Sequence, residues 1–437
     1  MDLNTYLTQL RRDLVLSVEE LERISVAFQG AMAAGLAGKP SSLKMLPSFI
    51  GLPTGKERGN VVAIDFGGTN VRVLDAELDG AGSIQVKRMI RFPLIDDKAG
   101  YNYLNEKADA GQLFGYIASK VAQLVRPGVD YSLGHTFSFP CQQLSINKAR
   151  LLLWTKEIKT RGVEGQEIGA LLDAALVHAG LPRVKSDAII NDTVGTLLAA
   201  AYSRKNVDVA SICGTGHNTC YLEPAHPLTG GPMIVNMESG NFDIVPQTRF
   251  DKALDAGSEY PGQQVVEKMI SGYYLGEIAR LILSEMSEMG LLPKSENLAK
   301  HQILRGADLD RILEDTGDLS GTQDVANRCL LMDKLSLEQR MALQTVITLL
   351  AQRSARFVAS TFQGTLLHVD PELEKPHFIA IDGSLYEKMP GYAAWLQQAL
   401  DELNPGALGR VSTLLAKDGS GIGAAIAAAT AAKEARG

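Results

Sequence analysis

The sequence lacks a hydrophobic run long enough to cross a membrane. No stretch approaches the roughly 18–20 uninterrupted apolar residues that a spanning helix needs, and residues 1–12 are polar with early charges, unlike a signal peptide. We therefore expect a cytoplasmic protein that does not act on a membrane.

An excess of positive charge is also absent. The chain has 43 Lys and Arg residues against 50 Asp and Glu residues, which gives a net charge of -7. A protein that binds nucleic acid nonspecifically or lies on an acidic membrane surface usually carries a basic excess. Neither nucleic acid nor a membrane is expected as a partner, and an anionic ligand must be held by local donors.

Cysteine is scarce and histidine forms no metal signature. The 4 cysteines show no CxxC spacing, which favours buried thiols over a disulfide framework. The 7 histidines include no His-Glu-x-x-His, and we interpret His135 and His178 as ordinary core or surface residues. The sequence therefore indicates neither disulfide bonds nor a zinc site.

The composition is that of a globular protein with a large core. The chain has 437 residues, of which 45% are hydrophobic, so we expect about two to three domains. Ser17 and Glu20 form a capping box before an amphipathic helix. Long helical patterns cover 265–289 and 337–362, and Ser336 and Gln339 are in capping-box register at the start of the second. Apolar strand patterns alternate with these helices, which predicts an α/β architecture.

Two glycine turns follow apolar strands about 150 residues apart. The run 61–64 leads into residues 65–70 and a second strand at 71–74, and residues 211–222 repeat this pattern around Gly214-Thr215-Gly216. Such self-similarity indicates an internal duplication. Further turns are expected at 382–384 and at the glycine-rich segment 418–423.

The first glycine turn has the composition of a phosphate-binding loop. Gly67 and Gly68 can take positive φ and direct backbone amides into one concavity, and Thr69, Asn70 and Arg72 add side-chain donors. One such turn alone is more often a tight hairpin, but two related turns and a late glycine-rich one favour phosphate. Asp65, at the strand end, could bind Mg²⁺ through water or simply cap the turn.

A second candidate feature opens a helix after the strand pattern 188–190. In Asn191-Asp192-Thr193, the Asp192 carboxylate could accept the proton of an attacking hydroxyl group. Asn191 could bind a neighbouring hydroxyl, and Thr193 is expected on the phosphate side. A helix N-cap explains the same residues equally well.

Other polar residues interrupt apolar surroundings in a way that suits a neutral polyol. Such a ligand needs many donors and acceptors in one pocket. The residues that supply both kinds are Ser138, Thr155, Lys156, Glu238 and Glu267.

Taken together, these segments resemble the ATP-dependent hexokinases of the sugar kinase, actin and Hsp70 superfamily. The resemblance covers most of the chain, and its segments occur in family order. They are 42–48, 65–72, 136–143, 153–156, 191–196, 214–221, 267–277 and 418–425.

The resemblance implies a two-domain actin-like ATPase (ribonuclease H-like) fold with a cleft between a small and a large domain. The small domain would span 59–191, joined by the C-terminal helix at about 425–437. The large domain would comprise 1–58 and 192–424. Closure of the two domains over the sugar would then keep water away from ATP.

The same resemblance implies roles for individual residues. Asp192 takes the position of the catalytic base, and the metal bound with ATP would be Mg²⁺. The first phosphate segment would be Asp65, Gly67, Gly68, Thr69, Asn70 and Arg72. The second would be Gly214, Thr215 and Gly216, and the adenosine segment would be Gly419, Ser420 and Gly421. The sugar set would be Ser138, Phe139, Pro140, Thr155, Lys156, Asn191, Asp192, Asn218, Glu238 and Glu267.

We therefore expect transfer of the ATP γ-phosphoryl group to the 6-hydroxyl of glucose or a related hexose, with Mg²⁺-ATP as donor, by a monomer or homodimer. Four positions depart from the family pattern. Ser239 replaces a frequent Trp, residues 240–243 form a shorter segment, His217 replaces a small hydroxyl residue, and Ile422 replaces a frequent Lys. The first two departures leave fructose, mannose or an amino sugar open as the preferred substrate, and the last two concern the affinity for the nucleotide. A sugar sensor without turnover is the alternative from another class.

Overall fold

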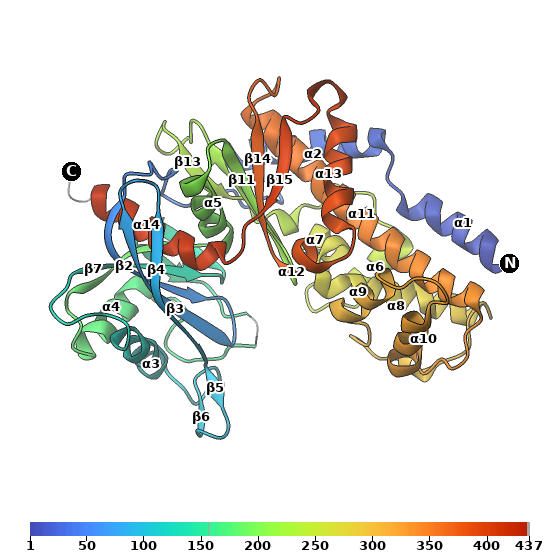
Figure 1. Ribbon diagram of the computed structural model, residues 1–437, viewed down its shortest axis with the longest axis horizontal. Coiled ribbons are helices and arrows are strands. Elements are labelled where there is room, and N and C mark those ends of the chain that lie inside the picture. Colours follow the sequence, from blue (N-terminus) through green and yellow to red (C-terminus); the bar gives the residue numbers. More distant parts are fainter. Residues whose placement is uncertain (156, 435–437) are drawn as a thin grey trace. The chain divides into compact units, whose positions relative to one another are not determined.

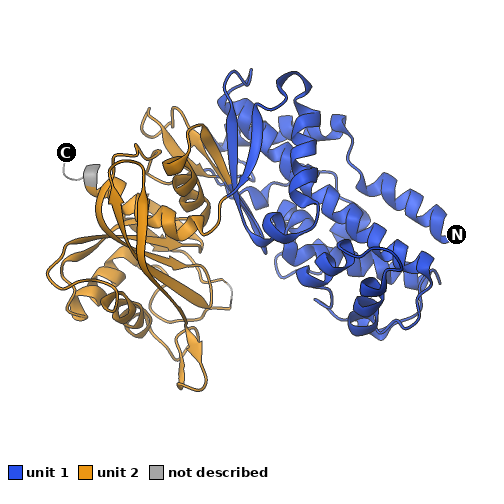
Figure 2. Cartoon of the chain, in the orientation of Figure 1, with its two compact units in different colours: residues 1–45, 211–219, 237–415 blue, residues 46–210, 220–236, 416–437 orange. Residues whose placement is uncertain are grey.

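The computed structural model describes residues 1–155 and 157–434. The chain forms two compact units (Figure 2). Unit 1 comprises 1–45, 211–219 and 237–415, and unit 2 comprises 46–210, 220–236 and 416–437. Both units combine helices with sheet, which confirms the α/β class. Within the described residues, no helix has the length and apolarity required to span a bilayer.

Unit 2 is built around a five-stranded mixed sheet with the order β10-β7-β2-β3-β4. Strands β2, β7 and β10 run parallel, whereas β2, β3 and β4 form an antiparallel meander. The bounds are β2 Arg58–Phe66, β3 Asn70–Asp79, β4 Ile84–Pro93, β7 Tyr131–Phe137 and β10 Val184–Ile190. The β2–β3 hairpin confirms the strand, glycine turn and strand expected at 61–74.

Helices cover both faces of this sheet (Figure 1). On one face, α3 (Ala110–Ala122) and α4 (Ile168–His178) share an apolar core with β2, β3 and β7. On the other face, α14 (Gly419–Glu434) crosses β7 and α5 (Asp192–Ser203). The crossing is very close, because a Cβ atom on Gly423 would lie 1.9 Å from the carbonyl oxygen of Gly195.

The smaller strands of unit 2 form short pairs. A hairpin of β5 and β6 and another of β8 and β9 are both antiparallel. Their bounds are β5 Ile95–Asp96, β6 Tyr101–Asn102, β8 Cys141–Ser145 and β9 Lys148–Leu151.

A six-stranded sheet has the order β1-β13-β12-β11-β14-β15. Its bounds are β1 Leu46–Pro47, β11 Val207–Cys213, β12 His217–Glu223, β13 Met233–Asn236, β14 His377–Asp382 and β15 Val411–Leu415. Adjacent β11 and β12 flank the second glycine turn, as the sequence pattern predicts.

Unit 1 is mainly helical, and the long helix α11 packs against α1, α2 and α13. The capping boxes predicted at Ser17 and Ser336 are both present. The helices are α1 Leu3–Leu14, α2 Val18–Leu36, α6 Arg249–Ala256, α7 Val265–Ile270, α8 Gly272–Glu288, α9 Gly306–Leu313, α10 Ser320–Val325, α11 Leu337–Val369, α12 Ser384–Lys388 and α13 Tyr392–Leu403. The remaining turns are 3₁₀ helices at Ser239–Asn241, Glu296–Ala299 and Pro405–Ala407 and a π-helix at Ala326–Leu330.

Two sequence predictions about these elements are wrong. The single helix expected over 265–289 is broken at Ser271, where the amide of Gly272 donates to the carbonyl of Gly214 at 2.9 Å. Most of segment 418–423, expected as a turn, forms the start of α14. Its glycines allow close helix packing, since a Cβ atom on Gly419 would lie 3.0 Å from the Cα atom of Thr196.

Candidate active site

Asp192 is the first residue of α5, and Asn191 is the N-cap of this helix. The Oδ1 atom of Asn191 accepts hydrogen bonds from the amide of Thr193 at 2.9 Å and from its hydroxyl at 2.7 Å. The Asp192 Oδ1 atom also lies 2.9 Å from the Thr193 amide. Asn191 thus takes the capping role, and the half-buried Asp192 lies in the first turn of α5, at the positive end of the helix dipole.

Thr193 supports Asn191 and is fully buried at 0% exposure. Its hydroxyl donates to Asn191, so this side chain fixes the residue before Asp192. The expected place of Thr193 on the phosphate side stays a prediction from the sequence.

Asp65, Arg72 and Ser420 form a polar cluster in unit 2. Arg72 donates to Oδ2 of Asp65 from Nε at 3.1 Å and from Nη2 at 2.5 Å, and Ser420 donates to the same oxygen at 2.9 Å. The cluster therefore joins the first phosphate segment to the predicted adenosine segment. Gly421 lies next to it, with its Cβ position 3.9 Å from the Asp65 Cβ atom.

The glycine pair of the first turn differs from expectation in its backbone. Neither Gly67 nor Gly68 has a φ between +20° and +160°, so the predicted left-handed conformation is wrong. A Cβ atom at either position would meet nothing within 4 Å. The neighbouring Thr69 and Asn70 are exposed. Packing against other protein atoms therefore does not explain why glycine stands at these two positions. Glycine also leaves room for a ligand to approach the backbone, and the open space here is consistent with that role.

The second glycine turn in unit 1 lies against Glu267. The amide of His217 donates to Oε2 of Glu267 at 2.8 Å, and a Cβ atom on Gly216 would lie 2.9 Å from this oxygen. The carbonyl of the exposed Thr215 accepts from the Tyr273 amide at 3.2 Å. Gly214 packs on Gly383, with its Cβ position 3.3 Å from the Cα atom there.

Asn218 and Glu238 are neighbours in the same unit. The Nδ2 atom of Asn218 donates to Oε1 of Glu238 at 3.4 Å. Glu238 has a left-handed backbone, with φ 53° and ψ 50°. The structure therefore brings Gly216, Asn218, Glu238 and Glu267 to one part of unit 1.

Burial perturbs two ionisable groups beside this turn. His217 and Cys213 lie in contact, with 3.7 Å between Nδ1 and Sγ. Burial lowers the pKa of His217 to about 4 and raises the pKa of the Cys213 thiol to about 12. Both groups are consequently neutral near pH 7. Cys141, Cys213, Cys220 and Cys329 are all free cysteines, as the sequence indicates.

The remaining predicted sugar residues lie after β7 and β9 in unit 2. The amide of Ser138 donates to the carbonyl of Phe66 at 3.4 Å. Phe139 is part of the core and meets Trp154 edge to face at 5.0 Å. Backbone carbonyls of Pro140 and Thr155 accept from Leu152 and Ile158 at 2.9 and 3.2 Å. Lys156 lies outside the described residues.

Sequence reasoning missed Asp418 as a neighbour of Arg72. The Oδ1 atom of Asp418 accepts from Nη1 of Arg72, and the Asp418 backbone has a φ of 53°. Asp418 precedes the first residue of α14, Gly419. The sequence feature that could have identified Asp418 is its position directly before the Gly-Ser-Gly segment 419–421.

Comparisons with known proteins give a consistent family. Family models described as Hexokinase match residues 6–202 and 208–430. The chain is 34% identical to Hexokinase-1 of Schizosaccharomyces pombe, covering 99% of this chain and 92% of that protein. It is 37% identical to Hexokinase-1 of Oryza sativa subsp. japonica, covering 96% and 90%.

Solved structures show the same likeness along the whole chain. A hexokinase crystal structure matches with a TM-score of 0.87 and 32% identity, covering 98% of this chain and 99% of that chain. The hexokinase from Schistosoma mansoni complexed with glucose matches with a TM-score of 0.84 and 30% identity, covering 98% of both chains.

Proposed function

Because the chain belongs to the hexokinase family, ATP-dependent phosphotransferases that phosphorylate hexoses, we propose that it transfers the γ-phosphoryl group of ATP to the 6-hydroxyl of glucose, with Asp192 as the general base. Family membership and the hexokinase fold confirm the resemblance found in the sequence. Glucose as acceptor is supported by the glucose complex of the Schistosoma mansoni enzyme.

The observation that supports Asp192 as the base is its place beside Asn191. Because Asn191 caps α5, the Asp192 carboxylate is not required to start the helix. A carboxylate in this position can accept a proton as the hydroxyl oxygen attacks phosphorus. Phosphoryl transfer otherwise needs mainly alignment and neutralisation of charge.

Two groups of residues supply the remaining contacts in this proposal. In unit 1, Asn218, Glu238 and Glu267 provide acceptors and a donor for sugar hydroxyls. In unit 2, the open backbone at Gly67 and Gly68 and the guanidinium of Arg72 suit phosphate oxygens.

The donor set also fits a hydrated magnesium ion. Mg²⁺ prefers oxygen ligands and keeps several waters, so it can bind one carboxylate through water together with ATP phosphates. Asp65, with Ser420 at 2.9 Å, supplies such an oxygen. The ion would neutralise phosphate charge, while the protein's own residues orient the sugar and remove its proton.

A coupled assay for ADP release with and without glucose tests the reaction. We expect Asp192→Asn to keep the shape of the side chain and to lower kcat by a factor of about 10² to 10⁴, with a smaller effect on glucose binding. Near-normal turnover of Asp192→Asn would exclude it as the base. Glucose binding without glucose-dependent ADP release in the unaltered protein would instead favour a sugar sensor.

We also propose that the predicted small domain (59–191 with the C-terminal helix at about 425–437) and the predicted large domain (1–58 and 192–424) close when sugar binds, because ATP must be protected from water. Small-angle scattering at saturating glucose should give a smaller radius of gyration than the sugar-free protein. An unchanged radius would contradict closure. The cytoplasmic location stays a prediction from the sequence.

A further inference from the structure

Three buried hydroxyl groups form a chain beside the predicted sugar residues of unit 1. Ser239, Thr219 and Ser211 are each 0% exposed. Ser239 Oγ donates to Thr219 Oγ1 at 3.1 Å, and Thr219 Oγ1 lies 3.1 Å from Ser211 Oγ. Ser211 Oγ in turn donates to the backbone carbonyl of Asn218 at 2.8 Å. The chain joins the 3₁₀ turn Ser239–Asn241 to strand β12.

The direction of this chain follows from the number of hydrogens. A hydroxyl group has one hydrogen to donate and two lone pairs to accept with. Because Ser211 gives its hydrogen to a carbonyl, which can only accept, Thr219 must donate to Ser211. Thr219 then has only acceptor capacity left for Ser239. All three hydroxyls thus have one consistent arrangement, which removes a source of disorder at this point.

The same contacts fix the orientation of the Asn218 side chain. Its Oδ1 atom accepts from the amide of Thr219 at 2.7 Å and from the amide of Ser239 at 3.3 Å. With the oxygen held by two donors, the NH₂ group faces Oε1 of Glu238 at 3.4 Å. Movement of Ser239 would therefore disturb both Asn218 and Glu238.

The turn that carries Glu238 needs to be held in place. A left-handed backbone at a residue other than glycine is unfavourable and persists only when the surroundings impose it. Gly240 packs tightly in this turn, because a Cβ atom there would lie 3.0 Å from both the His217 carbonyl oxygen and the Glu267 Cβ atom. The hydroxyl chain is a specific attachment of this turn to β12.

We propose that Ser239, acting through Thr219 and Ser211, is a positioning residue that holds Asn218 and Glu238 in the geometry for hexose binding. The inference rests on the proposed function, which assigns these two residues to the sugar. Ser239 is also one of the positions where the sequence is expected to depart from the family pattern.

Thr219→Val tests the inference without changing the shape of the side chain. Valine suits a strand and fills the same volume but breaks the chain on both sides. We expect the glucose KM to rise about tenfold, a size typical of losing a buried hydrogen bond, while kcat stays within about twofold. Thr219→Ser keeps the hydroxyl and should restore a KM near that of the unaltered protein.

Thr365→Val is the matched control for a buried hydroxyl elsewhere in unit 1. Thr365 is 0% exposed and its hydroxyl donates to the Thr361 carbonyl within α11 at 2.9 Å. This variant should lose stability without a change in glucose KM. An equal KM in Thr219→Val and Thr365→Val, or a similar increase in Thr219→Ser and Thr219→Val, would overturn the positioning role.

Asn218→Ala separates the inference from the proposed function. If Asn218→Ala raises the glucose KM and Thr219→Val does not, only the positioning inference fails. If Asn218→Ala leaves the KM unchanged, the assignment of the sugar residues fails and the inference fails with it. Calorimetric titration with glucose measures the same change in affinity independently of turnover.

Discussion

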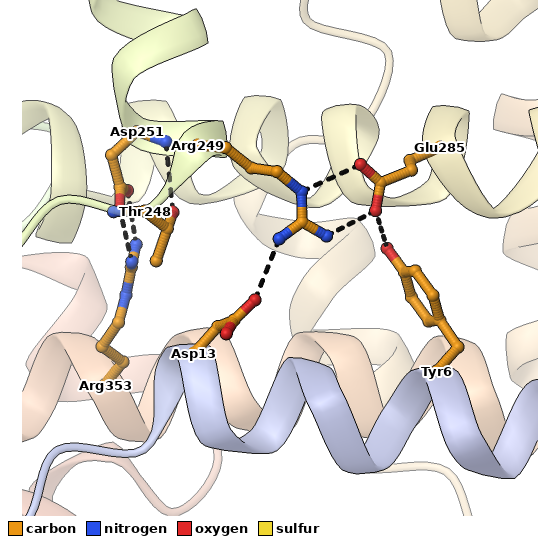
Figure 3. Close-up of polar contacts among 7 residues, drawn as sticks. All are labelled: Tyr6, Asp13, Thr248, Arg249, Asp251, Glu285 and Arg353. Atoms are coloured by element: carbon orange, nitrogen blue, oxygen red, sulfur yellow. Dashed lines mark hydrogen bonds and ion pairs between the residues drawn. The ribbon is translucent and has the colours of Figure 1, made fainter.

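Arg353 and Asp251 form a bidentate ion pair in the interior of unit 1 (Figure 3). The two N–O distances, Nη1 to Oδ2 and Nη2 to Oδ1, are both 2.8 Å, and the side chains are 1% and 0% exposed. Thr248 also donates to Asp251 from its amide and hydroxyl. Burial raises the pKa of Asp251, but the charge and hydrogen bonds of Arg353 and the hydrogen bonds from Thr248 together outweigh burial, so the pKa is lowered.

Arg353→Met should strongly destabilise unit 1, because it leaves a buried carboxylate without its cation. Breaking such a pair typically costs about 3–5 kcal/mol. Arg249→Met is the control, since Arg249 bonds Glu285 and Asp13 (Figure 3). Its side chain is 45% exposed, and exposed pairs contribute about 0–1 kcal/mol each. Hydrogen exchange of α6 and α11 amides measures both losses. Equal losses in the two variants would contradict the argument.

His135 should make unit 2 less stable in acid. The ring is fully buried, meets Phe137 at 5.2 Å, and neither ring nitrogen has a hydrogen-bond partner among the described residues. Burial lowers the pKa of His135 to about 3, against an ordinary value near 6.5. The unfolded chain therefore binds a proton between these pH values and the folded chain does not, so stability falls as the pH drops below about 6.5.

The size of this effect is on the order of 2–3 kcal/mol between pH 7.5 and pH 4.5. His135→Leu removes the titration, and we expect hydrogen exchange in β2 and β7 to become less dependent on pH. His178→Gln is the control, since His178 lies exposed at the end of α4. An unaltered pH dependence in His135→Leu would show that other groups cause the acid sensitivity.

Local signals in the sequence predicted those parts of the fold that depend on near neighbours. The capping boxes at Ser17 and Ser336 and the β2–β3 hairpin involve residues close in the chain. The break between α7 and α8 was missed because it depends on Gly272 bonding Gly214, far away in sequence. Glycines at the start of α14 were mistaken for a turn because their close packing on α5 is a tertiary contact.

The candidate site shows the same limit. Gly216 and Glu267 could be identified as site residues from the sequence. Their contact could not be predicted: a Cβ atom on Gly216 would lie 2.9 Å from Oε2 of Glu267. Likewise, Ser239 lies in a 3₁₀ turn and its hydroxyl partner Thr219 lies on β12, and no pattern of spacing reveals this pair. The roles of the site residues stay predictions that variants must test.

Gly216→Ala should raise the glucose KM, because the new methyl group would displace the Glu267 carboxylate from the His217 amide. We expect an increase of about tenfold, the size of a lost charge-assisted hydrogen bond, with a smaller change in kcat. Gly306→Ala is the control, since a Cβ atom there meets nothing within 4 Å. Initial rates over a range of glucose concentrations measure the effect, and an unchanged KM would exclude Glu267 from the sugar set.

Asp418→Asn should lower the KM for ATP. Two carboxylates, Asp65 and Asp418, hold the Arg72 guanidinium, and ATP phosphates must compete with them for this cation. Asp418 is 65% exposed, so removing its charge should change the KM by a factor of only about two to five. Asparagine tolerates a left-handed backbone well, so the φ of 53° at this position need not change.

Asp130→Asn is the control for removing the negative charge of Asp418. Asp130 pairs with Arg183 on the surface of unit 2 and is 73% exposed. It should leave the KM for ATP unaltered. Since the competition is electrostatic, the difference between Asp418→Asn and the unaltered protein should shrink as the salt concentration rises. A higher KM for ATP in Asp418→Asn would mean that Asp418 orients Arg72 toward the nucleotide instead of competing with it.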